Sequence, residues 1–195
     1  MLRSDGRMPS SSTLLTSGAS SSIGLAGMDT ISGGSGGIDF DQIDASNMTT
    51  AVNLTLTVAE GGTLVSGADT ASFDDIELFS LGSGNDTVTG GVGNENVVLG
   101  LGDDFAEGGA GNDTLAGGAG NDSIDAGLGD DTVYGGADND AIAGQDGNDQ
   151  IYGGLGADIL SGDAGNDLLY GDAGDDIVAG GSGDDTLYGG ADNDL

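Results

Sequence analysis

The sequence predicts an all-β fold, a parallel β-solenoid with 18 residues per coil and an irregular β cap at its N-terminal end. Three observations predict it. From Leu81 onward the chain divides without insertion into twelve nine-residue units and part of a thirteenth, the eighth position of every full unit is apolar, and glycine dominates the first, second and fourth positions. A strict period of this kind is the signature of an architecture in which each repeat stacks on its neighbours.

The end of each unit has the pattern of a very short strand. The three residues x-apolar-x place one side chain on one face of a sheet and its two neighbours on the other. A lone apolar residue every nine positions cannot form a helix face, which needs spacings of three and four. We expect the six glycine-rich residues that precede each strand to form a turn. Two units then close a coil, and stacked coils give two parallel sheets with a thin aliphatic core. The eighth-position residues expected in that core are Val88, Val97, Ala106, Leu115, Ile124, Val133, Ile142, Ile151, Leu160, Leu169, Val178 and Leu187.

The residues before the array are less regular. Val52, Leu54, Leu56 and Val58 alternate with polar residues, which predicts a strand. A solenoid also needs its first coil covered. We therefore predict a flexible Ser/Gly-rich tail over residues 1–27, degenerate repeats and an N-terminal cap over 28–80, and the repeat array over 81–195.

Acidic residues dominate the charge. The chain has 34 of them against two arginines, Arg3 and Arg7, and a formal net charge of -32; from Leu81 on there are 24 acids and no cation. A protein that binds nucleic acids or anionic membranes needs a basic surface, so the chain should bind neither. No apolar run approaches the 18 or so residues of a membrane span, so we predict no membrane insertion. An array with this charge either stays disordered or recruits cations, and its strict period favours the second.

The residue types needed for common catalytic sites are missing. The chain contains no histidine, lysine or cysteine. Gly33–Gly37 matches the G-x-S-x-G pattern of a hydrolase nucleophile, but without histidine no Ser-His-Asp triad can form. We predict that the chain is not an enzyme.

The unit GGxGxDxUx, repeated in tandem, resembles the RTX (repeats-in-toxin), or haemolysin-type, calcium-binding repeat. The resemblance implies a parallel β-roll in which calcium lies between turns that are one coil apart. It also implies that the ligands are sixth-position carboxylates together with turn carbonyls, notably at the second and fourth positions. The sixth-position residues on one edge would be Asp86, Asp104, Asp122, Asp140, Asp158, Asp176 and Asp194, and those on the other Glu95, Asp113, Asp131, Asp149, Asp167 and Asp185. One ion between each adjacent pair gives up to about 11 calcium ions.

The chemistry of calcium supports this expectation independently. Calcium takes six to eight oxygen ligands at about 2.3–2.6 Å, and stacked turns bring carboxylates and carbonyls together. Without the metal, the columns of carboxylates would repel one another, so folding should need the ion. Glu95 is longer than aspartate, so its site is expected to be weak or empty. Asp138 and Asp192 at the fourth position, and Gln145, Asp163 and Asp172 at the second, replace glycine where the turn shape needs it.

Four tyrosines, Tyr134, Tyr152, Tyr170 and Tyr188, are 18 residues apart. They should form one outward ladder on a single sheet. The ladder is interpreted either as cross-strand stacking that stabilises the sheet or as a contact strip for a protein or glycan.

The resemblance also implies a location. Repeats of this family stay unfolded at the low calcium of the bacterial cytoplasm and fold outside the cell after type I secretion. Residues 1–27 lack the apolar stretch of a cleavable signal peptide, which fits that route. We therefore predict a calcium-binding, secreted or cell-surface bacterial protein, and we expect the chain to be a fragment of a longer one. Two alternatives stay open: a calcium-dependent appendage of a secreted protease, lipase or epimerase, and a structural or adhesive surface or matrix protein capable of self-association.

Overall fold

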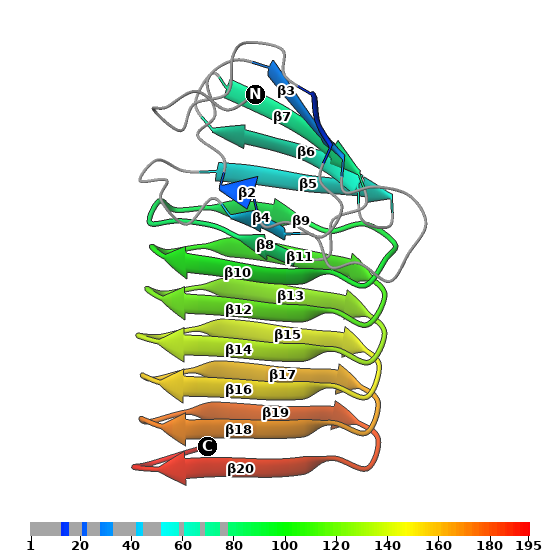
Figure 1. Cartoon of the computed structure of the whole chain (residues 1–195). Helices are drawn as coiled ribbons and strands as arrows, with labels where there is room; N and C mark the ends of the chain where they lie inside the picture. Colours follow the sequence, from blue (N-terminus) through cyan, green and yellow to red (C-terminus); the bar gives the residue numbers. More distant parts are fainter. Residues whose placement is uncertain are drawn as a thin grey trace.

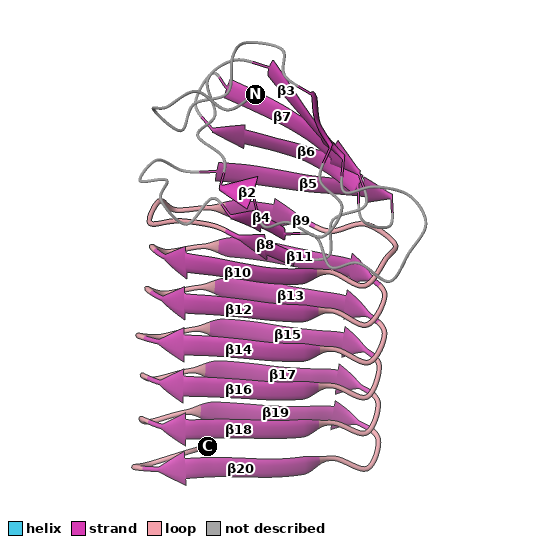
Figure 2. Cartoon of the chain, viewed as in Figure 1, coloured by secondary structure: helices cyan, strands magenta, loops and turns pink. Residues whose placement is uncertain are grey.

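The computed structural model describes residues 13–15, 21–22, 28–32, 42–44, 52–58, 61–66, 69–74 and 78–195. All regular secondary structure in these residues is β-strand (Figure 2). The strands stack in two layers along one axis, with the N-terminal strands at one end and the C-terminus at the other (Figure 1). No helix long and apolar enough to cross a membrane occurs in this part of the chain.

Twenty strands make up the described chain. Those before the array are β1 (Thr13–Leu15), β2 (Ser21–Ser22), β3 (Met28–Ser32), β4 (Gln42–Asp44), β5 (Val52–Val58), β6 (Gly61–Ser66), β7 (Asp69–Asp74) and β8 (Leu78–Ser80). Those of the array are β9 (Thr87–Thr89), β10 (Asn96–Leu101), β11 (Phe105–Ala110), β12 (Thr114–Ala119), β13 (Ser123–Leu128), β14 (Thr132–Ala137), β15 (Ala141–Asp146), β16 (Gln150–Leu155), β17 (Ile159–Ala164), β18 (Leu168–Ala173), β19 (Ile177–Ser182) and β20 (Thr186–Ala191).

Successive strands of the array alternate between two sheets. Sheet I has 11 strands in the order β1-β3-β7-β6-β5-β9-β11-β13-β15-β17-β19, and sheet II has nine in the order β2-β4-β8-β10-β12-β14-β16-β18-β20. Each strand of the array pairs in parallel with the strand two further on, and the partners are 18 residues apart, as in Val97↔Leu115 and Leu115↔Val133. The predicted parallel solenoid with 18 residues per coil is therefore confirmed.

The core is a narrow space between the two sheets. The eighth-position residues from Val88 to Leu169 are all buried, as predicted. In the last coils Val178 packs partly buried against this core and Leu187 is 44% exposed. The first position adds a second inward column that the sequence reasoning missed: Leu81, Leu99 and Ala126 are also buried.

The strands are longer than predicted. From β10 to β20 each has six residues, because it runs on through the first three residues of the next unit. The prediction of three-residue strands and six-residue turns was wrong. The parallel pairing continues through the second and third positions, where Gly100 pairs with Gly118 and Leu101 with Ala119. The turn proper is left with only the fourth to sixth positions.

The backbone φ angles explain why glycine is the usual residue at the second and fourth positions. From Gly100 onward, glycines at the second and fourth positions have φ angles of 101–149°, which an L-residue cannot adopt without strain. Gln145, Asp163 and Asp172, and likewise Asp138 and Asp192, have φ angles of only 69–84°. These residues retain positive φ by moving to the left-handed region, where asparagine and aspartate are found most often among non-glycine residues.

The strand predicted over Val52–Val58 is confirmed as β5, which lies next to the first array strand of sheet I. It pairs in parallel with β9, and Val52 and Leu54 continue the buried core. Beyond it the sheet changes direction, since β5, β6 and β7 pair antiparallel. The glycine-rich segment 33–39 lies outside the described residues. The division of the chain at residues 27 and 80 stays a prediction, with β1 and β2 lying in the first part.

A hydrogen-bonded ladder runs along the fifth position of the turns, and the sequence reasoning missed it. The side-chain oxygen of each Asn or Asp accepts a hydrogen bond from the backbone N–H of the fifth-position residue one coil later, at 2.7–3.3 Å. Ala157 interrupts the ladder, because it has no oxygen to offer to the N–H of Asp175. Side-chain oxygens of this kind accept hydrogen bonds from turn N–H groups that have no partner in a neighbouring strand.

We therefore predict that Ala157→Asn stabilises the array. The new amide would accept from the N–H of Asp175 and donate to Oδ1 of Asn139, as Asn139 itself donates to Asn121. One net hydrogen bond contributes about 1 kcal/mol, which corresponds to a rise of about 2–4 °C in the melting temperature. The measurement is thermal unfolding at saturating calcium. Ala157→Leu, which adds bulk but no acceptor, is the control; an equal gain in both variants would refute the ladder as the cause.

Candidate metal centre

All thirteen sixth-position acids lie at the ends of turns, in two columns on opposite edges of the solenoid. Turns that follow strands of sheet II contain Asp86, Asp104, Asp122, Asp140, Asp158, Asp176 and Asp194; turns that follow strands of sheet I contain Glu95, Asp113, Asp131, Asp149, Asp167 and Asp185. The structure thus brings the predicted residues into the two predicted sets. Those from Asp86 to Asp176 are at most 5% exposed, whereas Asp185 and Asp194 are half-buried.

One oxygen of each aspartate in the columns accepts a hydrogen bond from the backbone that precedes it in its column. The N–H of Asp104 donates to Oδ1 of Asp122, and the N–H of Asp131 donates to Oδ1 of Asp149, both at 2.8 Å. The same contact joins every adjacent pair along both columns at 2.7–3.2 Å. Its direction is opposite to that of the fifth-position ladder. The carboxylates are therefore fixed in position by the backbone rather than free in solvent.

The other oxygen has no hydrogen-bond partner. The buried atoms concerned are Oδ2 of Asp104, Asp113, Asp122, Asp131, Asp140, Asp149, Asp158, Asp167 and Asp176, together with both carboxylate oxygens of Glu95. A buried charged acceptor without a partner is strongly unfavourable. Repeated along both edges, these atoms form two rows of carboxylate oxygens that a hard cation would satisfy. The residues present therefore fit calcium.

Asp86 differs from the other column acids because both of its carboxylate oxygens accept hydrogen bonds from the backbone. Its Oδ1 accepts from the N–H of Val52 at 2.7 Å and its Oδ2 from the N–H of Gly82 at 3.3 Å. Both oxygens already have a protein donor. Its column thus begins at β5, whose first residue takes the place of a preceding turn.

The first-position glycine makes room for the unpartnered oxygen. A Cβ atom on Gly108 would lie 2.6 Å from Oδ2 of Asp113, and one on Gly135 would lie 2.5 Å from Oδ2 of Asp140. Such contacts are too short to tolerate, so only glycine allows the carboxylate to fold back against the strand. Leu99 and Ala126 carry a side chain at this position. Oδ2 of Asp104 and of Asp131 is nevertheless buried and unpartnered, as it is in Asp113 and Asp140.

The turn carbonyls offer further oxygens. Third- and sixth-position carbonyls, such as those of Ala119 and Asp104, accept backbone hydrogen bonds from a neighbouring coil, and the second-position carbonyl of Gly82 accepts one from Leu101. Fourth-position carbonyls of the described turns, such as that of Gly102, accept none of these bonds. No group of three or more acidic side chains that could hold a metal occurs in the described residues.

Burial changes the acidity of these columns. Loss of water around the carboxylates raises the pKa of Asp104, Asp131 and Asp140 to about 7 and that of Asp122 and Asp149 to about 6. The backbone hydrogen bond to Oδ1 opposes the shift, and nearby carboxylates add to it. Burial raises the pKa of Glu95 most clearly, and the charge of Asp113 adds to it. Metal-free columns of this kind hold protons at a pH where ordinary aspartates are ionised.

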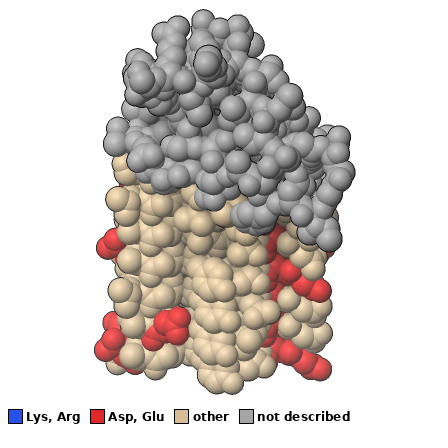
Figure 3. All heavy atoms as spheres, in the orientation of Figure 1, with Lys and Arg blue, Asp and Glu red and all other residues tan. Residues whose placement is uncertain are grey.

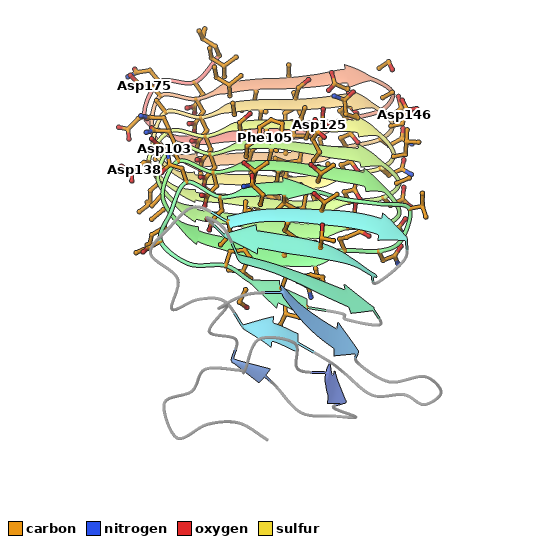
Figure 4. All side chains as sticks on the ribbon, turned by 90° about the horizontal axis from the view of Figure 1, so that it is seen from above. Asp103, Phe105, Asp125, Asp138, Asp146 and Asp175 are labelled. Atoms are coloured by element: carbon orange, nitrogen blue, oxygen red, sulfur yellow. The ribbon has the colours of Figure 1, made fainter. Side chains whose placement is uncertain are left out.

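Fifth-position aspartates behave in the opposite way. Hydrogen bonds from the backbone and side-chain amides of Asn121, Asn148 and Asn193 lower the pKa of Asp103, Asp130 and Asp175, respectively. These exposed carboxylates stay ionised on the surface of the edges; Figure 4 shows Asp103 and Asp175 along one edge, with Asp146 at the opposite one. Adjacent turn positions thus have different roles, which the spacing alone did not distinguish. Ser35, the rejected nucleophile, lies outside the described residues.

Comparison with known proteins gives an independent assignment. Four copies of the RTX calcium-binding nonapeptide repeat match residues 73–106, 107–142, 134–169 and 170–195, which together span more than half of the chain. No curated protein matched the sequence. The family matched is the one that the repeat resembles, and its calcium fits the two rows of unpartnered carboxylate oxygens. The chain belongs to the RTX calcium-binding nonapeptide repeat family, and its array is a β-roll of calcium-binding repeats.

Proposed function

We propose that this chain binds a row of calcium ions along each edge and that it folds when it binds them. The observation that carries the proposal is the unpartnered, buried Oδ2 in turn after turn, since calcium supplies the missing partner. In this proposal each ion lies between two turns that are one coil apart. Its ligands are the two sixth-position carboxylates and the carbonyls of the second and fourth positions.

The proposed ligand set comprises all thirteen sixth-position acids, with up to about 11 ions. Two members differ from the rest: Glu95 has both oxygens unpartnered, and Asp86 has both already hydrogen-bonded. We expect the site of Glu95 and Asp113 to bind more weakly than those of the middle of the array.

The negative charge of the array is the reason to expect that calcium binding is coupled to folding. Residues 81–195 have no cation, and eleven of their carboxylates are buried. No side chain in the array can neutralise these columns, so an ion from solution must do so. Calcium binding free energy is then folding free energy. A module of this kind stays unfolded at low calcium and folds at extracellular calcium, which supports a secreted or surface location in a bacterium.

We assign no catalysis to the module. The chain has no histidine, lysine or cysteine, and the described residues hold no group of three or more acidic side chains that could bind a catalytic metal. Its contribution is a rigid, calcium-dependent scaffold.

The ligand assignment predicts that Asp149→Asn lowers the calcium stoichiometry by about two ions per chain. Asparagine keeps the Oδ1 that accepts from Asp131 but loses the charge that faces calcium. Both sites that contain Asp149, with Asp131 and with Asp167, should weaken. Isothermal titration calorimetry or equilibrium dialysis measures the number of ions.

Asp146→Asn is the matched control. It makes the same charge change three residues away, at the exposed last residue of β15, just before the turn that contains Asp149, and should leave the stoichiometry as it is. Unchanged calcium binding in Asp149→Asn, or an equal loss in both variants, would contradict the assignment.

The raised pKa values predict a dependence on pH. The pKa of these carboxylates is raised above the unfolded value near 4 to about 6–7 in the metal-free fold. That fold therefore binds more protons than the unfolded chain, and its stability falls as pH rises through this window. Calcium must displace those protons, so its affinity should rise between about pH 5 and 7.5. Calorimetry in buffers of different ionisation enthalpy measures the protons released. Calcium affinity that is independent of pH in this window would refute the burial of ionisable ligands.

A further inference from the structure

The two outer faces of the β-roll differ in charge. The strands of sheet I from β11 to β19 carry four acids, Glu107, Asp125, Asp146 and Asp163, whereas those of sheet II from β10 to β20 carry only Asp172. Figure 3 shows the sheet II face as largely uncharged, with acidic atoms along its margins and in one patch. In a chain of net charge -32, this face, named here the neutral face, is where another acidic molecule can approach with least repulsion.

A stack of tyrosines lines the neutral face. The rings of Tyr134, Tyr152, Tyr170 and Tyr188 lie one above another on β14, β16, β18 and β20, with centroids 5.1, 5.1 and 4.8 Å apart and planes within 11°. The predicted outward ladder on one sheet is thus confirmed. Tyr134 and Tyr188 are 45% and 51% exposed. On the same sheet, Leu101 of β10 and Leu155 of β16 are 58% and 62% exposed.

The stacking decides what the ladder can recognise. A sugar binds an aromatic residue through the face of the ring, and in Tyr152 and Tyr170 both faces are covered by the next rings. What remains accessible is a row of ring edges and hydroxyl groups. No described residue is hydrogen-bonded to these hydroxyls, and each can donate and accept. Such a row is complementary to a second copy of itself.

We propose that two copies of this chain associate through their neutral faces. A second copy presents tyrosines and apolar side chains at the same coil spacing, so the two rows match in a two-fold contact. Six strands of six residues cover roughly 29 Å by 20 Å, an area at the small end of specific interfaces, so the dimer is weak, with a micromolar dissociation constant. The inference rests on the proposed function, because calcium must fold the array and neutralise its edges first.

Substitutions that add charge to one face test it. Gln150→Glu with Thr186→Glu places two carboxylates on exposed positions of the neutral face, on β16 and β20. Ala141→Glu with Ala179→Glu adds the same charge to exposed positions of sheet I, on β15 and β19. Sedimentation velocity of each full chain, with calcium and with chelator, gives the oligomeric state. Circular dichroism and calcium stoichiometry on the same samples report folding and binding.

We expect the unmutated chain to dimerise in calcium, the sheet I variant to dimerise equally, and the neutral-face variant to dissociate at least about tenfold more readily while binding as much calcium. A folded, calcium-loaded chain that remains monomeric up to about 100 μM would overturn the inference and leave the proposed function intact. A dimer that both variants weaken equally, or neither weakens, would also overturn it. A monomer whose tyrosine fluorescence responds to oligosaccharides would assign the face to a glycan instead. Failure to bind calcium at all would overturn the proposed function itself.

Discussion

The structure depends on one arrangement, a buried carboxylate of which one oxygen is hydrogen-bonded and the other has no partner. The N–H of each sixth-position residue fixes Oδ1 of the next carboxylate along its column, while Oδ2 stays buried and unpartnered. The first bond joins each coil to the next. The second oxygen leaves an unfavourable charge that the protein itself cannot neutralise, since the array has no cation. In the function proposed above, folding and cation binding are therefore a single event.

The rest of the molecule is arranged around that constraint. The core is a pair of columns of small and aliphatic side chains, too thin to hold two acidic edges together by hydrophobic burial alone. Glycine at the first position admits Oδ2 of Asp113 and its equivalents, and positive φ angles at the second and fourth positions turn the chain. At the N-terminal end, Val52 supplies the hydrogen bond that a preceding turn would have supplied to Asp86. The calcium columns thus have a defined beginning.

Much of this could be predicted from the sequence, because a strict period fixes register. The eighth-position core, the two edges of acids and the tyrosine stack on one sheet all follow from counting in nines and eighteens. The length of the strands did not follow, since nothing in GGx suggests a ladder until Gly100 is seen paired with Gly118. The inward position of Leu99 and Ala126 was also missed, although their departure from glycine was the available signal. The direction of the two side-chain ladders depends on backbone orientation in the turns, which spacing alone does not specify.

The central claim is that the buried carboxylates prevent folding at neutral pH until calcium neutralises them. The most direct measurement is far-UV circular dichroism of the full chain at neutral pH, first in excess chelator and then during titration with calcium. The account predicts a coil spectrum in chelator and a cooperative change to β-structure with a midpoint of about 10⁻⁴–10⁻³ M calcium, which magnesium at the same concentration does not produce. A chain that is already fully β-structured in excess chelator would contradict it.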